Sequence, residues 1–184
     1  MQKEVLAVKV LVTAASKHGA TAEIASVIAA LLEAEHIDVD LLAPEQVDRV
    51  AGYDAVVLGS GVYAGHWLKT AKRFVERHED ELRELPLFVF SSGPVGAPPK
   101  ESDEPAEIAA VDAAIHPVDH RVFGGRLTAS QLGPFEKLII GIVKAPLSDD
   151  RPWDEIADWA KEIARYVKGE DPRATSALAP PVPV

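Results

Sequence analysis

The chain has 184 residues, 47% of them hydrophobic, no cysteine and a formal net charge of −10. This length suits one domain with a substantial core, and the acidic balance argues against nucleic acid or an anionic membrane as partner. The lack of cysteine excludes disulfides and thiolate chemistry. No apolar run approaches the roughly 18 residues of a membrane span. The amino terminus shows no signal-peptide organisation, so we expect a cytoplasmic protein.

Strand-like and helix-like segments alternate along the chain. The predicted strands lie near 5–13, 37–42, 54–60, 86–92 and 120–127. The predicted helices lie near 20–35, 66–80, 104–115, 133–145 and 152–168. This alternation predicts an α/β fold, a doubly wound five-stranded parallel sheet with helices on both faces. The rhythm matches the strand order 2-1-3-4-5, in which a ligand binds beyond the carboxyl ends of the strands, between strands 1 and 3.

The first predicted strand ends in a small, polar loop. The strand is nearly all apolar, as expected for a strand that helices cover on both faces. The loop residues are Ser16, Lys17, His18, Gly19, Ala20 and Thr21. They offer backbone N–H groups, two hydroxyls and the positive end of a helix dipole, which together suit a phosphate dianion. The alternative is an ordinary turn in which Thr21 caps the helix.

This loop differs from the two common glycine-rich phosphate motifs. Dinucleotide sites need G-x-G-x-x-G and nucleoside triphosphate sites need G-x-x-x-x-G-K-[ST], whereas this segment has one glycine, Gly19, with no lysine after it. The run Ser-Lys-His-Gly-Ala-Thr resembles the loop with which flavodoxins hold the phosphate of FMN. The resemblance implies FMN as cofactor. Ala20 replaces the asparagine that often precedes the final threonine in flavodoxins.

The third predicted strand runs into a second glycine-containing loop. Glycines let the backbone approach a flat ring closely and adopt positive φ. Tyr63 is the best candidate to stack on such a ring, whereas we expect Trp67 to pack under its own helix. The residues proposed for cofactor binding here are Ser60, Gly61, Val62, Tyr63, Ala64, Gly65 and His66.

The loop after the fourth strand is also small. Its backbone N–H groups could reach the edge of the ring. The residues proposed for cofactor binding here are Ser91, Ser92, Gly93, Pro94 and Gly96. No tyrosine follows Phe90, so Pro94 or Val95 would cover the second ring face, or that face would be open. An open face would suit a reaction with a substrate or partner.

Longer segments of the chain resemble one flavodoxin-domain family. The segments are 11–25, 53–78, 122–146 and 149–164. They are similar to the family that includes the menaquinone-dependent protoporphyrinogen dehydrogenases, and the similarity covers roughly 5–168. It implies a flavodoxin-like, FMN-binding domain over 1–169 that transfers reducing equivalents to an acceptor such as a quinone. We expect the Pro/Ala-rich tail, 170–184, to be disordered.

One departure from that family leaves the enzymatic activity open. In the protoporphyrinogen enzymes the segment after the fifth strand is rich in arginine and aromatic residues, which suit a tetrapyrrole with two propionates. Here the corresponding segment is 128–134, and Arg126 is the one cation nearby. An FMN-dependent oxidoreductase of this type is therefore one of the hypotheses.

Other chemistry finds little support in the sequence. Pro117 separates His116 from His120, so the two do not share a helix face, and we expect no metal site. No Gly-x-Ser-x-Gly elbow accompanies a triad. Two classes of function stay open: an FMN redox protein that exchanges electrons with a partner protein or a small-molecule or quinone acceptor, and a non-redox module that binds a phosphate ligand or a protein. The three small loops favour the first.

Overall fold

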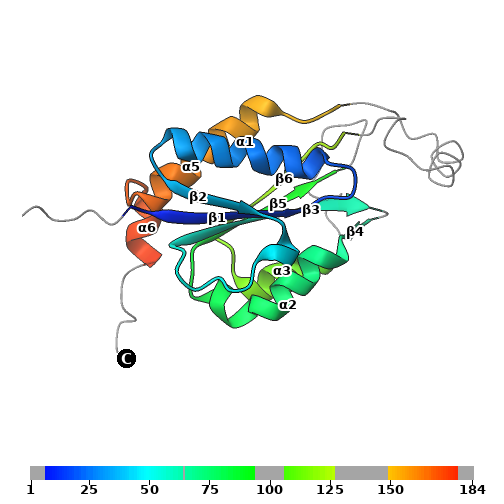
Figure 1. The fold of residues 1–184 in the computed structure, drawn as a ribbon, viewed down its shortest axis with the longest axis horizontal. Coiled ribbons are helices and arrows are strands. Elements are labelled where there is room, and N and C mark those ends of the chain that lie inside the picture. Colours follow the sequence, from blue (N-terminus) through cyan, green and yellow to red (C-terminus); the bar gives the residue numbers. More distant parts are fainter. Residues whose placement is uncertain (1–6, 64, 94–105, 127–148, 178–184) are drawn as a thin grey trace, which may run out of the picture.

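Five parallel strands form the sheet of the computed structural model, which describes residues 7–63, 65–93, 106–126 and 149–177. The strands are β1 (Lys9–Ala15), β2 (Asp38–Leu42), β3 (Ala55–Tyr63), β5 (Leu87–Ser92) and β6 (Asp119–Phe123). Their order is β2-β1-β3-β5-β6, and every neighbouring pair is parallel (Figure 1). This is the order 2-1-3-4-5 once the short strand β4 is set aside, so the predicted topology is confirmed.

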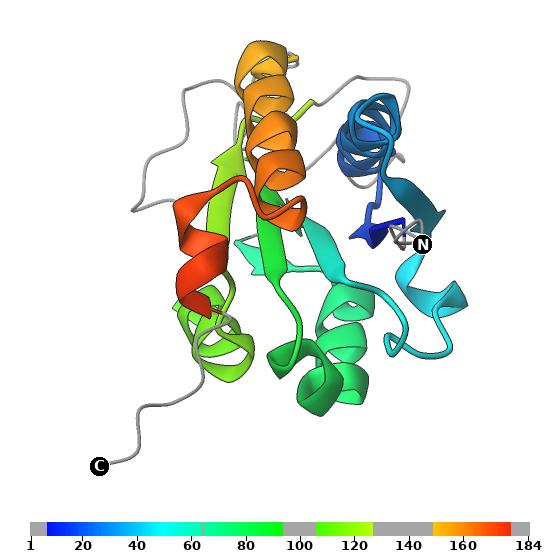
Figure 2. The same cartoon turned by 90° about the vertical axis from the view of Figure 1, so that its left-hand side faces the viewer.

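Helices cover both faces of the sheet. One layer holds α1 (Ala20–Ala34) and α5 (Trp153–Val167), and the other holds α2 (Lys69–Arg83) and α3 (Ala106–Ile115) (Figure 2). A single 3₁₀ turn, η1 (Pro44–Gln46), follows β2. In the described part of the chain, no helix has the length and apolarity needed to cross a membrane.

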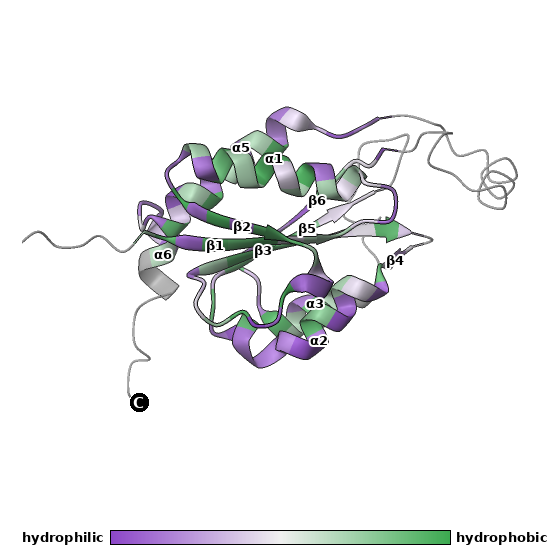
Figure 3. Cartoon of the chain, viewed as in Figure 1, coloured by the Kyte–Doolittle hydropathy of each residue, from purple (hydrophilic) through white to green (hydrophobic). Residues whose placement is uncertain are grey.

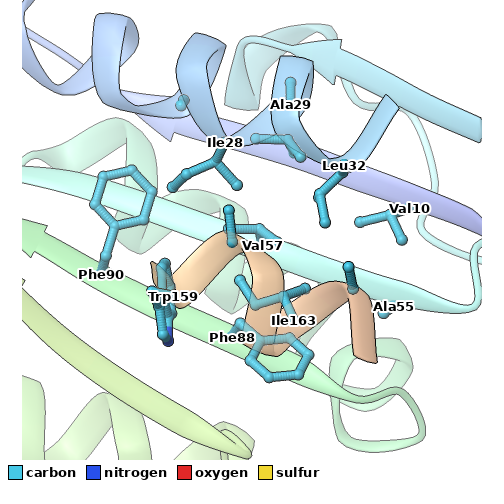
Figure 4. Close-up of a cluster of buried hydrophobic side chains, with 14 of the residues drawn as sticks. Val10, Ile28, Ala29, Leu32, Ala55, Val57, Phe88, Phe90, Trp159 and Ile163 are labelled. Atoms are coloured by element: carbon cyan, nitrogen blue, oxygen red, sulfur yellow. The ribbon is translucent and has the colours of Figure 1, made fainter. Parts of the chain in front are cut away.

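The strands bury alternate side chains against the two helix layers. Val10 and Val12 pack in the cluster under α1 and α5, whereas Leu11 and Ala15 pack in the cluster under α2 and α3. Trp159 of α5 closes the first cluster with edge-on contacts to Phe88 and Phe90 (Figure 4) and to Phe123. Apolar residues follow the strands and inner helix faces, and polar residues cover the outer faces (Figure 3). This burial is the main source of stability for the scaffold.

The helix predicted over 66–80 begins later than expected. His66 and Trp67 form strand β4, which pairs antiparallel with Val62 and Tyr63 at the end of β3. The reason is a hairpin: β3 continues beyond 60, and Gly65, with φ 78°, reverses the chain. The prediction of a helix near 133–145 lies outside the described residues.

The tail predicted to be disordered from 170 onward contains a helix at its start. Helix α6 spans Pro172–Ala177, and Ala174 packs in the cluster under α5. Arg173 pairs with Asp171 at 2.7 Å and holds the pKa of that carboxyl at about 2, because the guanidinium stabilises the charged form. The prediction of disorder is therefore wrong for residues 172–177, which are helical. Residues 178–184 lie outside the described part.

Gly59 is required by the core. A Cβ atom at this position would lie 2.2 Å from Cζ of Phe90, its partner on β5. We expect Gly59→Ala to lower the free energy of unfolding in urea by roughly 1–3 kcal/mol through overpacking. Adding Phe90→Leu should cost less than the sum of the two single losses, because leucine vacates part of the ring volume. Strictly additive losses would contradict this contact.

Candidate functional site

A cavity lies at the carboxyl ends of β1, β3 and β5, the end toward which the strand arrows point in Figure 1. Parallel strands end at one edge of the sheet, so the loops that follow them meet there. The lining residues are Ser16, Lys17, His18, Ala20, Thr21, Gly61, Val62, Tyr63, Leu68, Ser92, Gly93, Gly125 and Arg126. The structure thus brings together residues from all three predicted loops.

The start of α1 forms one end of the cavity. Its N-cap is Gly19, in the left-handed conformation with φ 85°, and no side chain caps the helix. The interpretation of Thr21 as an ordinary helix cap is therefore wrong, because glycine takes the strained position and Thr21 lies inside the first turn. The hydroxyl of Ser16 is buried and has no hydrogen-bond partner among the described residues. Donors without acceptors at a helix N-terminus suit an anion.

The backbone of β3 closes over this end of the cavity. A Cβ atom at Gly61 would lie 3.0 Å from the Oγ1 atom of Thr21, whose side chain is almost fully buried. A larger residue at 61 would press on that hydroxyl. The absence of a side chain at Gly61 therefore allows β3 to pack closely against the first turn of α1.

Tyr63 lies at the mouth of the cavity and is 39% exposed. The ammonium group of Lys17 lies 3.6 Å from the centroid of its ring, and the ring of His18 lies 6.2 Å away, tilted by 59°. An ammonium over an aromatic face is a cation–π contact. The first two loops therefore meet around an aromatic ring that a flat ligand can reach.

Two buried serines anchor the hairpin that carries Tyr63. Trp67 donates from Nε1 to the Oγ atom of Ser91 at 3.0 Å, and the backbone N–H of Leu68 donates to the Oγ atom of Ser60 at 3.1 Å. Both serines are fully buried. They lie behind the cavity wall, where they position the loop.

The structure also assembles a chain of polar contacts behind Ser91. The Nε2 atom of His120 lies 3.2 Å from the Oγ atom of Ser91, and Nδ1 lies 2.9 Å from Oδ2 of Asp112. These residues come from β6, β5 and α3, so the sequence search for a serine–histidine–aspartate group could not find them. Ser91 is inaccessible to a substrate, and the chain of contacts holds α3 and the hairpin to the sheet.

An ionic cluster joins the start of α1 to the segments that flank 127–148. Glu23, in the first turn of α1, accepts hydrogen bonds from Arg126 at 3.0 Å and from Arg151 at 2.7 Å. Arg151 also binds Asp149 through two nitrogens, at 2.7 and 2.6 Å. The two arginines lower the pKa of Glu23, Arg151 having the larger effect, because both favour the carboxylate.

The other residues proposed from the sequence lie as follows. Gly65 is in the hairpin turn and His66 is the first residue of β4, and both are exposed. Ala64, Pro94 and Gly96 lie outside the described residues. The sequence did not predict Leu68, Gly125 or Arg126 as cofactor-binding residues. Arg126 was notable in the sequence only as the one cation after the fifth strand, and its ionic partner Glu23 lies 103 residues away in the chain.

Comparisons with known proteins agree with this geometry. The model of the family described as "Flavodoxin domain" matches residues 11–152. The chain belongs to the flavodoxin family. Flavodoxin domains bind FMN at this edge of their sheet, so FMN is the cofactor of this chain.

Individual relatives of this flavodoxin-family chain are distant. Protoporphyrinogen IX dehydrogenase (quinone) of Escherichia coli K12 is 24% identical over 171 residues, which cover 85% of this chain and 94% of the relative. A flavodoxin from the domain Archaea has a TM-score of 0.60 at 18% identity, over 87% of this chain and 99% of that one. A flavodoxin variant from Pseudomonas aeruginosa has a TM-score of 0.58 at 16% identity, over 88% and 99%. The structural neighbours support the fold.

The residues of the cavity fit FMN. A phosphate needs several donors at once, and the uncapped α1 terminus, the Ser16 hydroxyl and the nearby Lys17 provide them. A flat ring system needs an aromatic surface at the cavity mouth, which Tyr63 offers. The cavity thus offers hydrogen-bond donors for a phosphate and an aromatic surface for a flat ring.

The Glu23 cluster predicts a pH-dependent stability. Because the folded-state pKa of Glu23 is lowered, its contribution exists above the pKa of the unfolded state and is lost as the pH falls through the folded-state value. We expect Glu23→Gln to lower the free energy of unfolding at pH 7 by roughly 0.5–1 kcal/mol, a small value because the carboxylate is half-exposed. Urea unfolding between about pH 7 and pH 3 should show the difference shrinking once the pH falls below the ordinary range of a glutamate.

The matched control is Glu33→Gln, at an exposed position near the other end of α1. Its effect should be smaller than that of Glu23→Gln at pH 7. A Glu23→Gln difference that stays constant down to pH 3 would contradict the role of the carboxylate.

Proposed function

We propose that this chain holds FMN in the cavity described above and transfers electrons between a substrate or partner protein and an acceptor such as a quinone. The site assignment depends on hydrogen-bond donors that lack acceptors at the start of α1. These donors are the N–H groups of the uncapped helix terminus and the buried Ser16 hydroxyl. When bound, FMN supplies the capacity to accept and release electrons. The protein contributes binding, orientation and charge.

Each part of the cavity has a distinct role in this proposal. Ser16, Thr21 and the first turn of α1 bind the phosphate. Tyr63 offers a face to the ring, and the backbone near Ser92 and Gly93 borders the same cavity from β5. The bonds from Trp67 and Leu68 keep the hairpin in place, so that little ordering is needed when the cofactor binds.

The phosphate site can be tested at Thr21. Thr21→Asp places a carboxylate against the phosphate and should abolish FMN binding in a fluorescence titration, because like charges repel in a partly buried site. Thr21→Val removes the hydroxyl alone and should weaken binding about tenfold. Circular dichroism checks that both variants fold.

The matched control for added charge is Ser26→Asp, on the exposed face of the same helix. It should bind FMN as the unaltered protein does. Undiminished FMN affinity in Thr21→Asp would show that the phosphate is held elsewhere.

Two basic side chains, Lys17 and Arg126, line the cavity, and Glu23 balances the charge of Arg126. A nearby cation stabilises the negative charge that reduction adds. We therefore expect a less negative potential than that of a low-potential carrier with acidic surroundings. Lys17→Gln should lower the reduction potential for the second electron by roughly 45 mV, which corresponds to a free energy of about 1 kcal/mol. A redox titration that shows no change, or a rise, would contradict this role.

A more specific candidate is the oxidation of protoporphyrinogen IX with a quinone as acceptor. Its support is the relative from Escherichia coli, which aligns with this chain over nearly its whole length. The test incubates FMN-loaded protein with protoporphyrinogen IX and a quinone, and follows porphyrin fluorescence above the uncatalysed rate. Quinone reduction by another donor without porphyrin formation would assign the chain to general electron transfer.

A further inference from the structure

Arg126 reaches the cavity from the segment that follows β6. It follows β6, lines the cavity together with Ser16 and Thr21, and has a side chain that is 20% exposed. Its terminal nitrogens are held by Glu23, in the first turn of the helix that forms the phosphate end. A guanidinium group is therefore fixed close to the proposed phosphate position.

One donor of this guanidinium has no acceptor. The Nε atom of Arg126 is buried and lacks a hydrogen-bond partner among the residues described. A buried charged donor without an acceptor costs free energy, so its persistence beside a cavity points to a ligand that accepts the bond. The Ser16 hydroxyl, which lines the same cavity, is in the same condition.

Glu23 is held in place by a second arginine besides Arg126. Its carboxylate is also bonded to Arg151, whose side chain is 3% exposed and is fixed in turn by Asp149. The orientation of Arg126 is thus set by a rigid anchor. The carboxylates of Glu23 and Asp149 balance the two arginines, so the cluster adds little net charge to the cavity. It can therefore contribute to ligand binding through a directional hydrogen bond.

We propose that Arg126 donates a hydrogen bond from Nε to the phosphate of FMN, that Glu23 positions it, and that this bond makes the site select FMN over riboflavin. The proposal rests on the proposed function and adds to it a residue that determines specificity. A charged hydrogen bond to phosphate is directional and roughly twice as strong as a neutral one. Riboflavin, which lacks the phosphate, cannot accept it.

The experiment compares dissociation constants for FMN and riboflavin by fluorescence titration. In Arg126→Gln, FMN binding should weaken about 10- to 100-fold, whereas riboflavin binding should change less than about threefold. The readout is the dissociation constant for riboflavin divided by that for FMN, because general damage to the fold would weaken the binding of both ligands alike and leave this ratio unchanged. Arg126→Lys keeps the charge but lacks Nε, and should still lower the ratio several-fold; it serves if the glutamine variant does not fold.

The matched control is Arg121→Gln. Arg121 lies on β6 and is bonded to Asp119 and Glu162, on the face that α5 covers. It should leave the ratio unchanged. The positioning role of Glu23 predicts that Glu23→Gln also lowers the ratio, by less than Arg126→Gln does.

The outcomes separate this inference from the function on which it rests. Equal weakening of FMN and riboflavin, or no change in either, would overturn the role of Arg126 while the unaltered protein still binds FMN. Failure of the unaltered protein to bind FMN would overturn the proposed function and the role of Arg126 with it.

Discussion

The start of α1 is the constraint on which the site depends. Gly19 ends the turn after β1 in a left-handed conformation and leaves the helix without a side-chain cap. A serine or aspartate at this position could satisfy one terminal N–H group, but its side chain would be strained at the φ of 85° that Gly19 adopts. The chain instead keeps donors available at the one edge of the sheet where three loops converge.

Stability comes from the layers around that edge. Tight contacts fix the sheet: Gly59 accommodates the ring of Phe90, and Trp159 packs on three aromatic rings. Polar contacts then fix the loops, through Ser60 and Ser91 on the hairpin and through Glu23 on the ionic cluster. The apolar core gives a rigid frame, and a few directed bonds place the loops of the cavity upon it.

The sequence was informative wherever structure depends on local pattern. Alternating strands and helices predicted the layered sheet and its order, and three small loops after strands predicted the edge at which the cavity lies. What it missed depends on partners distant in the chain. Arg126 and Glu23 are 103 residues apart, and the contact between Ser91 and His120 joins two strands. The strand β4 was mistaken for helix because two residues carry too little periodicity to distinguish a hairpin.

The most direct test of this account is the absorption spectrum of the purified protein after incubation with excess FMN and removal of free ligand. The account predicts the spectrum of a bound oxidised flavin at one FMN per chain, with vibrational structure sharpened by the cavity. A colourless protein that takes up no FMN would contradict it, and would mean that the donors at the start of α1 serve a different phosphate ligand.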